Sequence, residues 1–186
     1  MSPWFLEMVA TVFGVTSVYL LTVGDGRGWA LGGVWILLTG YVFWLNNILG
    51  SAILQVFFLV TQIVGWWRWK TGEQTDLRLS SHWLSGSQRV VVIVTYALGW
   101  AGLAWWLDQS DGTAVSMDSF VTVGSVLAQT LMVWGKRECW LVWLAVNLVY
   151  TALSFSQGLA GFTLLYTLFC GLAVNGWREW TRDREE

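Results

Sequence analysis

Two tryptophans, an asparagine and a tyrosine recur at helical spacing in the second half of the chain. They are Trp140, Trp143, Asn147 and Tyr150, and steps of three, four and three residues place them on one face of a helix. Indole rings stack on flat ring systems, and a carboxamide offers both a hydrogen-bond donor and an acceptor. This face therefore suits a flat ligand with a polar edge, and a cationic ring would gain a further cation–π attraction.

Each of these residues also has a structural interpretation. Trp140 lies near a membrane boundary, where belts of aromatic side chains are common, and for Trp140 alone the belt is the better explanation. Asn147 could instead hydrogen-bond a neighbouring helix. Only the combination of residues on one face favours a ligand site.

Four other side chains complete the candidate site. Tyr166 and Phe169, in the last apolar segment, are the nearest aromatic partners for Trp143. Gln62 and Gln129 lie at membrane depth and could bind ligand hydroxyl groups, although each is equally well explained as a contact between helices.

The titratable residues do not form a catalytic or metal-binding set. His82 is the single histidine and falls in a polar stretch, while Cys139 and Cys170 have no metal-ligand spacing and are expected to be packing residues. We therefore expect no enzyme activity, no catalytic residue, no metal site and no cofactor.

The elements that carry these residues are membrane helices. The chain is 55% hydrophobic and only 12% charged, whereas a soluble domain of this length needs far more polar surface. About 20 apolar residues span a bilayer as a helix. An all-α integral membrane protein is predicted, with seven transmembrane helices near residues 3–23, 29–45, 48–69, 90–107, 117–134, 140–155 and 162–180.

The positions of the basic residues predict the orientation. With seven helices, all ten lysines and arginines fall on the side that also holds the C-terminus. The positive-inside rule puts that side in the cytoplasm and the N-terminus outside. An even number of helices would break this segregation. No basic stripe suggests a nucleic-acid partner.

An offset of 111 residues aligns the first three predicted helices with the last three without a gap. The acidic Glu7 falls on Asp118, and both segments end in the pattern Gly-Trp-x-x-Trp, from Gly65 and from Gly176. We predict one transmembrane domain over residues 1–186, with repeats at 3–69 and 117–180, a linking helix at 90–107 and a cytoplasmic tail at 181–186. This 3+1+3 arrangement of parallel repeats resembles the SWEET sugar carriers, which bind solute near the bilayer midplane.

Positions that differ between the repeats are better ligand candidates than positions that they share. The counterparts of the four residues on the candidate face are Trp29, Gly32, Ile36 and Thr39. The second repeat has therefore gained two aromatic side chains and an amide.

The run Trp140-x-x-Trp143-x-x-x-Asn147, with Tyr150 and the aromatic ending of the chain, resembles the PnuC family of bacterial vitamin transporters. The resemblance covers the whole chain and implies transport of nicotinamide riboside. It implies that Trp140 and Trp143 enclose the pyridinium ring, with Phe169 or Tyr166 opposite, and that Asn147 bonds the polar edge of the ligand.

The resemblance also implies a place and a mode of action. It implies the bacterial inner membrane, homo-oligomers, and facilitated diffusion in which a cytosolic nucleoside kinase traps the imported vitamin. The sequence has no phosphate-binding glycine-rich loop and no carboxylate near the midplane, so we expect neither ATP hydrolysis nor ion coupling. Alternative substrates are thiamine, riboflavin or another nucleoside-like vitamin, and a non-transporting membrane scaffold is the alternative from another class.

Overall fold

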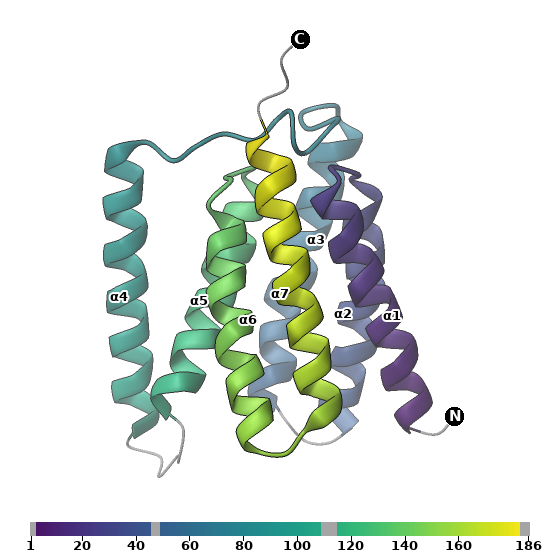
Figure 1. Ribbon diagram of the computed structural model, residues 1–186, viewed down its shortest axis with the longest axis vertical. Helices are drawn as coiled ribbons and strands as arrows, with labels where there is room; N and C mark the ends of the chain where they lie inside the picture. Colours follow the sequence, from purple (N-terminus) through teal and green to yellow (C-terminus); the bar gives the residue numbers. More distant parts are fainter. Residues whose placement is uncertain (1–2, 46–48, 109–114, 183–186) are drawn as a thin grey trace. The chain divides into compact units, whose positions relative to one another are not determined.

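The computed structural model describes residues 3–45, 49–108 and 115–182, and the side chains at 3–5, 7, 49–53 and 115 lie outside the description. The prediction that pairs Glu7 with Asp118 therefore concerns a side chain outside the described part. Within the described ranges the chain forms seven α-helices and no β-strand. The helices are α1 (Pro3–Thr22), α2 (Arg27–Leu45), α3 (Leu49–Lys70), α4 (Gly86–Asp108), α5 (Val115–Val133), α6 (Cys139–Ser156) and α7 (Ala160–Thr181) (Figure 1).

Five of the described helices are long and apolar enough to cross a membrane, namely α2, α4, α5, α6 and α7. Helix α1 carries a shorter apolar stretch, Met8–Thr22. The predicted all-helical architecture is confirmed, and five of its described helices have the length and hydropathy of membrane spans.

Helix α4 begins four residues earlier than the hydrophobic pattern predicts. The backbone N–H of Ser85 donates to Oε1 of Gln88 at 3.0 Å, and the N–H of Gln88 donates to Oγ of Ser85 at 3.3 Å. This reciprocal pair is a capping box, which satisfies backbone donors that the first turn of a helix leaves free. The polar first turn is therefore helical although it adds nothing to the apolar run.

The chain divides into two compact units. The first comprises Met1–Ser81 and Arg178–Glu186, and the second comprises His82–Trp177.

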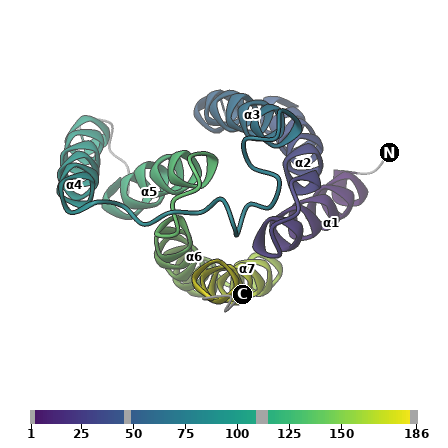
Figure 2. The ribbon, with the colours of Figure 1, turned by 90° about the horizontal axis from the view of Figure 1, so that it is seen from above.

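In the first unit, α1, α2 and α3 pack side by side in chain order (Figure 2). Ser17 of α1 donates its hydroxyl to the carbonyl of Gly28 in α2 at 2.7 Å. Trp29 is fully buried, and a Cβ on Gly65 of α3 would come within 2.5 Å of its indole. Small residues at the contacts thus let the three helices approach closely.

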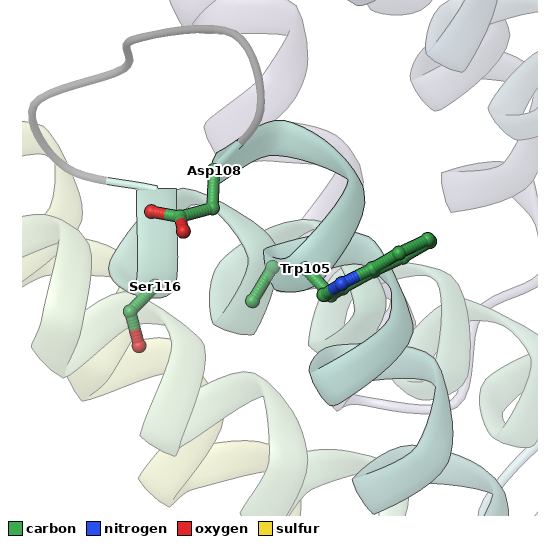
Figure 3. Close-up of a pocket in the computed structure, with 4 residues that line it drawn as sticks. Trp105, Asp108 and Ser116 are labelled. Atoms are coloured by element: carbon green, nitrogen blue, oxygen red, sulfur yellow. The ribbon is translucent and has the colours of Figure 1, made fainter.

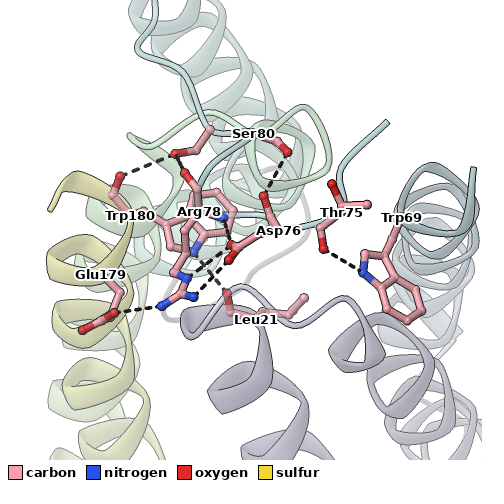
Figure 4. Close-up of polar contacts among 9 residues, drawn as sticks. Leu21, Trp69, Thr75, Asp76, Arg78, Ser80, Glu179 and Trp180 are labelled. Carbon is pink, nitrogen blue, oxygen red and sulfur yellow. Dashed lines mark hydrogen bonds and ion pairs between the residues drawn. The ribbon is translucent and has the colours of Figure 1, made fainter. Parts of the chain in front are cut away.

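The end of α7 and the segment after α3 close one end of this unit (Figure 4). The buried indole of Trp180 donates to the carbonyl of Leu21 at 3.1 Å. Arg78 bonds Asp76 at 3.0 Å and Glu179 at 3.2 Å. The segment is therefore held by bonds distant in sequence and is not a free polar loop.

In the second unit, α4 packs on α5 and α5 packs on α6, and Tyr150 of α6 stacks on Tyr166 of α7. Tyr96 of α4 donates to the carbonyl of Phe120 at 3.3 Å, and the indole of Trp100 donates to the carbonyl of Ser116 at 2.9 Å. Helix α4 has no buried residue. Glu138, just before α6, accepts hydrogen bonds from the N–H of Leu84 and from Arg89, which fixes the entry to α4 against the start of α6.

Candidate functional site

The residues predicted from α6 lie along one stretch of the helix but differ in burial. Trp140 is 1% exposed and Asn147 is 7% exposed, while Trp143 and Tyr150 are half-buried. Asn147 is eight residues beyond the first residue of α6, about 12 Å along its axis at 1.5 Å per residue, in a helix of 18 residues. The amide therefore lies near the middle of the span, where an uncompensated polar group is costly.

An aromatic cluster lies on the facing sides of α6 and α7. The rings of Tyr150 and Tyr166 are stacked, with centroids 4.6 Å apart and an angle of 9° between their planes. Phe162 and Phe169, one turn to either side on α7, each lie 6.5 Å from the Tyr166 ring. The structure brings Tyr150, Tyr166 and Phe169 together, so that Tyr166 stacks on Tyr150, whereas the sequence analysis had expected Tyr166 and Phe169 as partners of Trp143. The cluster also includes Phe162, four residues before Tyr166, which the sequence analysis missed.

Trp140 occupies a different environment from the rest of the face. A Cβ built on Gly176 of α7 would collide with the Trp140 indole, just as a Cβ on Gly65 would collide with Trp29. The two glycines and the two tryptophans are each 111 residues apart. These two tryptophan–glycine contacts are a packing device that both halves of the chain share, so packing alone explains the burial of Trp140.

The turns before these tryptophans are also alike. Gly24 and Gly135 have φ of +84° and +65°, a left-handed conformation that glycine adopts without strain. The N–H of Gly24 donates to the carbonyl of Leu21 at 3.2 Å, and the N–H of Gly135 donates to the carbonyl of Met132 at 3.0 Å. Each glycine carbonyl in turn accepts a bond from the segment after α3, from Leu77 N–H at 3.1 Å and from His82 N–H at 2.8 Å respectively.

The two predicted glutamines fall in different units. Gln129, in α5, is buried in the second unit. Gln62, in α3, belongs to the first unit and lies against Gly32 of α2, where a Cβ would come within 2.7 Å of Oε1. Gln62 is 7% exposed, and its Oε1 has no hydrogen-bond partner among the described residues.

The face formed by α6 and α7 is electrically neutral. Neither α6 nor the stretch 160–177 of α7 carries a charged side chain. The polar and aromatic groups of these two stretches are aromatic rings, hydroxyls and the amides of Asn147 and Asn175. Such a surface can bind a flat ligand by stacking and hydrogen bonds, and it offers no nucleophile–base pair.

An open hollow of about 260 Å³ lies elsewhere in the second unit, between the adjoining ends of α4 and α5 (Figure 3). Ala104, Trp105, Asp108 and Ser116 line it. Trp105 is 71% exposed, and its indole points away from Asp108 (Figure 3). None of the predicted site residues lines this hollow.

Comparison with known proteins identifies the family. Residues 4–182 match the family model described as "Nicotinamide mononucleotide transporter". The nicotinamide riboside transporter PnuC of Escherichia coli is 26% identical over 98% of this chain and 87% of its own length. The PnuC protein of Haemophilus influenzae is 25% identical over 96% of this chain and 80% of its own.

Two further relatives extend the comparison. The riboflavin/roseoflavin transporter RibM of Streptomyces davaonensis is 26% identical over 73% of this chain and 65% of its own. The crystal structure of the vitamin B3 transporter PnuC matches with a TM-score of 0.77 at 23% identity, over 95% of this chain and 80% of that one. That likeness establishes the fold. Together with the family match, it shows that the chain is a membrane transporter and not an enzyme, and that it belongs to the PnuC family, the nicotinamide mononucleotide transporter family.

Proposed function

We propose that this protein transports nicotinamide riboside by facilitated diffusion across the bacterial inner membrane. The observation that carries the proposal is the neutral aromatic face of α6 and α7, with one buried amide near the middle of the span. Relatives named as nicotinamide riboside transporters align with nearly the whole chain. Both the chemistry of the face and the family therefore favour the same ligand.

The chemistry of nicotinamide riboside matches this face group by group. Its pyridinium ring is flat and cationic, so it gains both stacking and a cation–π attraction on the half-buried indole of Trp143. Its carboxamide can pair with the amide of Asn147, which has complementary donors and acceptors. The aromatic cluster around Tyr166 supplies the opposite wall, and Trp140 stabilises the helix that carries the site.

A 3+1+3 arrangement of parallel repeats is part of the same proposal. The two tryptophan–glycine contacts and the two glycine turns support it, because they recur at one offset of 111 residues in backbone conformation, hydrogen bonding and packing. Helix α4 then serves as the linking helix that lets both repeats point the same way.

Transport by this protein is passive in our proposal. The transmembrane segments carry no lysine, arginine or acidic residue near the midplane, and ion-driven carriers usually need such a carboxylate. Net uptake then requires a cytosolic nucleoside kinase that phosphorylates the vitamin after entry. Reconstituted protein should equilibrate nicotinamide riboside without responding to a pH or sodium gradient, and should accumulate label only when a nucleoside kinase and ATP are enclosed.

Riboflavin is the second candidate substrate. RibM, a riboflavin/roseoflavin transporter, matches 73% of this chain at the same identity as the Escherichia coli relative. Stacking on aromatic side chains tolerates different flat rings, so the aromatic cluster alone does not select nicotinamide over a flavin.

Counterflow in proteoliposomes tests the proposal. We expect labelled nicotinamide riboside to exchange readily, and Trp143→Ala and Asn147→Ala each to reduce exchange about five- to thirty-fold, since each removes an interaction of about 1–2 kcal/mol in a desolvated site. Trp106→Ala is the matched control, because it removes an indole that is 63% exposed on α4.

The outcomes separate the candidates. Exchange of riboflavin or thiamine but not of nicotinamide riboside would show that the protein is a transporter with a different substrate from the one proposed. An equal loss of exchange in Trp143→Ala and Trp106→Ala would show that the α6–α7 face is not the binding site. No exchange of any vitamin by folded protein would contradict the proposed activity.

A further inference from the structure

Lys70, the last residue of α3, is an exposed cation without an acidic partner among the described residues. Its ammonium lies 5.3 Å from the centroid of the Trp66 ring and 5.7 Å from that of the Trp69 ring. The two rings also contact each other, with centroids 5.1 Å apart. Cation–π attraction thus fixes the position of the ammonium, but no carboxylate in the described part of the chain neutralises its charge.

The basic residues beside Lys70 do have acidic partners. Arg68, two residues earlier on α3, pairs with Glu73 at 3.0 Å. Arg27, at the start of α2, which packs on α3, pairs with Asp25. Of these three basic residues, Lys70 is therefore the one whose charge is left for an anion from outside the chain.

Exposed apolar surface and open space lie directly beside the ammonium. Trp67, one turn before Lys70 on the same side of α3, is 58% exposed. In the turn that follows the helix, a Cβ on Gly72 would meet nothing within 4 Å among the described residues. A ligand with an anionic group and an apolar portion can therefore reach Lys70 and Trp67 together.

The end of α3 lies at the height of lipid headgroups. The helix has 22 residues, which makes it about 33 Å long at 1.5 Å per residue, enough to cross the hydrocarbon core of a bilayer. Tryptophans are enriched at the ends of such helices, where the ring contacts acyl chains and the N–H reaches the polar layer. A lysine at this height extends its ammonium toward the phosphate groups. The ligand that the membrane presents to this end of α3 is a phospholipid.

The second half of the chain lacks this arrangement. Adding 111 to the number of Lys70 gives Thr181, which carries no charge, and adding it to that of Trp69 gives Trp180. Trp180 is 1% exposed and donates its indole N–H to a carbonyl of α1, whereas Trp69 is only half-buried. The chain itself therefore covers the end of α7 and leaves the end of α3 open.

We propose that Lys70, Trp66 and Trp67 bind an anionic phospholipid, whose phosphate lies against the Lys70 ammonium and whose acyl chain lies along Trp67. The cytoplasmic leaflet supplies such lipids, and the orientation predicted from the basic residues places Lys70 in that leaflet. The bound lipid fixes the depth of α3 in the membrane. This lipid site is separate from the proposed vitamin site and does not depend on which vitamin is transported.

Acylation of lysine side chains in nanodiscs tests the lipid site. The chain has two lysines, Lys70 and Lys136, so Lys136 reports the general effect of a negative membrane surface. Full-length protein is placed in phosphatidylcholine alone, or in equal parts of phosphatidylcholine and phosphatidylglycerol with the same acyl chains. A water-soluble acylating reagent is added, and peptide mass spectrometry follows each lysine. Relative to Lys136, we expect phosphatidylglycerol to slow the acylation of Lys70 about five-fold, because the bound phosphate covers the ammonium.

Two variants test the contribution of the indole. Trp67→Ala removes the apolar surface beside Lys70 and should reduce the protection by phosphatidylglycerol. Trp44→Ala is the matched control, because it removes an indole that is 65% exposed near the other end of α2, and it should leave the protection of Lys70 unchanged.

Three results with the wild type would overturn the lipid site, whether or not the variants fold. Equal slowing at Lys70 and Lys136 would show that the surface potential of the membrane acts without a site. Equal protection of Lys70 by inorganic phosphate in phosphatidylcholine nanodiscs would assign the site to a soluble anion. Unchanged acylation of both lysines would show that no anionic lipid binds there. Because no vitamin is present, each of these results leaves the proposed transport function intact.

Discussion

Trp29 and Trp140 each pack against a glycine of the facing helix, in the space that a Cβ atom would otherwise fill. Each indole is at most 1% exposed and lies against the backbone of a glycine, Gly65 near the end of α3 or Gly176 near the end of α7. Such contacts let two membrane helices approach closely enough for dispersion forces to act over a whole ring. The glycines should therefore be sensitive to the smallest possible substitution.

Gly65→Ala and Gly176→Ala are expected to destabilise the protein by about 1–3 kcal/mol each, the usual result of overpacking a close contact. The new methyl group on residue 65 would lie 2.5 Å from the indole of Trp29, so the ring or the helix must move. Thermal unfolding in detergent measures the effect.

Gly33→Ala and Gly171→Ala are the matched controls. A Cβ at either position meets nothing within 4 Å among the described residues, and alanine favours the helix over glycine by about 0.5–1 kcal/mol. We expect these variants to be as stable as the wild type or more so. Destabilisation of the same size in all four variants would contradict the packing role of Gly65 and Gly176.

For single residues, the sequence predicted which residue types share a face of a helix but not which residues each of them contacts. The spacing from Trp140 to Tyr150 identified the face of α6, and the ring contacts of Tyr150 with Tyr166 agree with it. The contact between Trp140 and Gly176 joins two different helices and leaves no periodic signal. The shared Gly-Trp-x-x-Trp ending was the available clue, because the glycine recurs at the offset of the tryptophan.

The helices themselves were predictable because apolar runs of membrane length have few alternatives. The exception, the start of α4, depends on the capping bonds between Ser85 and Gln88, which hydropathy does not register. The sequence analysis placed His82, in the segment between α3 and α4, in a polar stretch, yet backbone N–H groups of this segment bond to the carbonyls of Gly24 and Gly135, far away in sequence. Such non-local bonds follow from the packing of whole helices and not from the local residues.

Asp76 gives this segment a pH-dependent stability. Burial by itself would raise the pKa of Asp76, but hydrogen bonds from the side chain and backbone of Arg78 outweigh it and hold the pKa below the usual 3.8. A carboxylate with a lowered pKa stabilises the fold above its unfolded pKa and loses that contribution as the pH falls through the folded value. The contribution should therefore be complete at pH 7, begin to fall near pH 4 and be lost as the pH falls through the lower folded pKa.

Asp76→Asn tests this dependence. We expect the variant to melt at a lower temperature than the wild type at pH 7 and the difference to shrink as the pH falls below about 4. Glu73→Gln is the control, since Glu73 pairs with Arg68 while its own side chain is 48% exposed, and such surface pairs contribute little. A difference between Asp76→Asn and the wild type that is constant from pH 7 to pH 3 would exclude the ionised carboxylate as its source.

The whole molecule has one strong asymmetry, which is the distribution of charge. If seven helices cross the membrane, every lysine and arginine of the chain lies on the side of the C-terminus. Basic residues resist translocation, and the cytoplasmic leaflet is negatively charged, so this side should face the cytoplasm. Pairs such as Arg78 with Glu179 and Arg89 with Glu138 then lie at the cytoplasmic surface.

Labelling of introduced cysteines in cells measures this orientation directly. Gln157, in the exposed connection between α6 and α7, should lie outside, and the exposed Gln88, at the start of α4, should lie inside. A membrane-impermeant maleimide should therefore label Gln157→Cys in intact cells, and Gln88→Cys only after the membrane has been permeabilised. The wild type measures background labelling, because Cys139 is fully buried and Cys170 lies within α7. Reversed labelling would invert the proposed topology, and labelling of both variants from the same side would contradict the crossing of α4, α5 and α6 in succession, on which the segregation of charge depends.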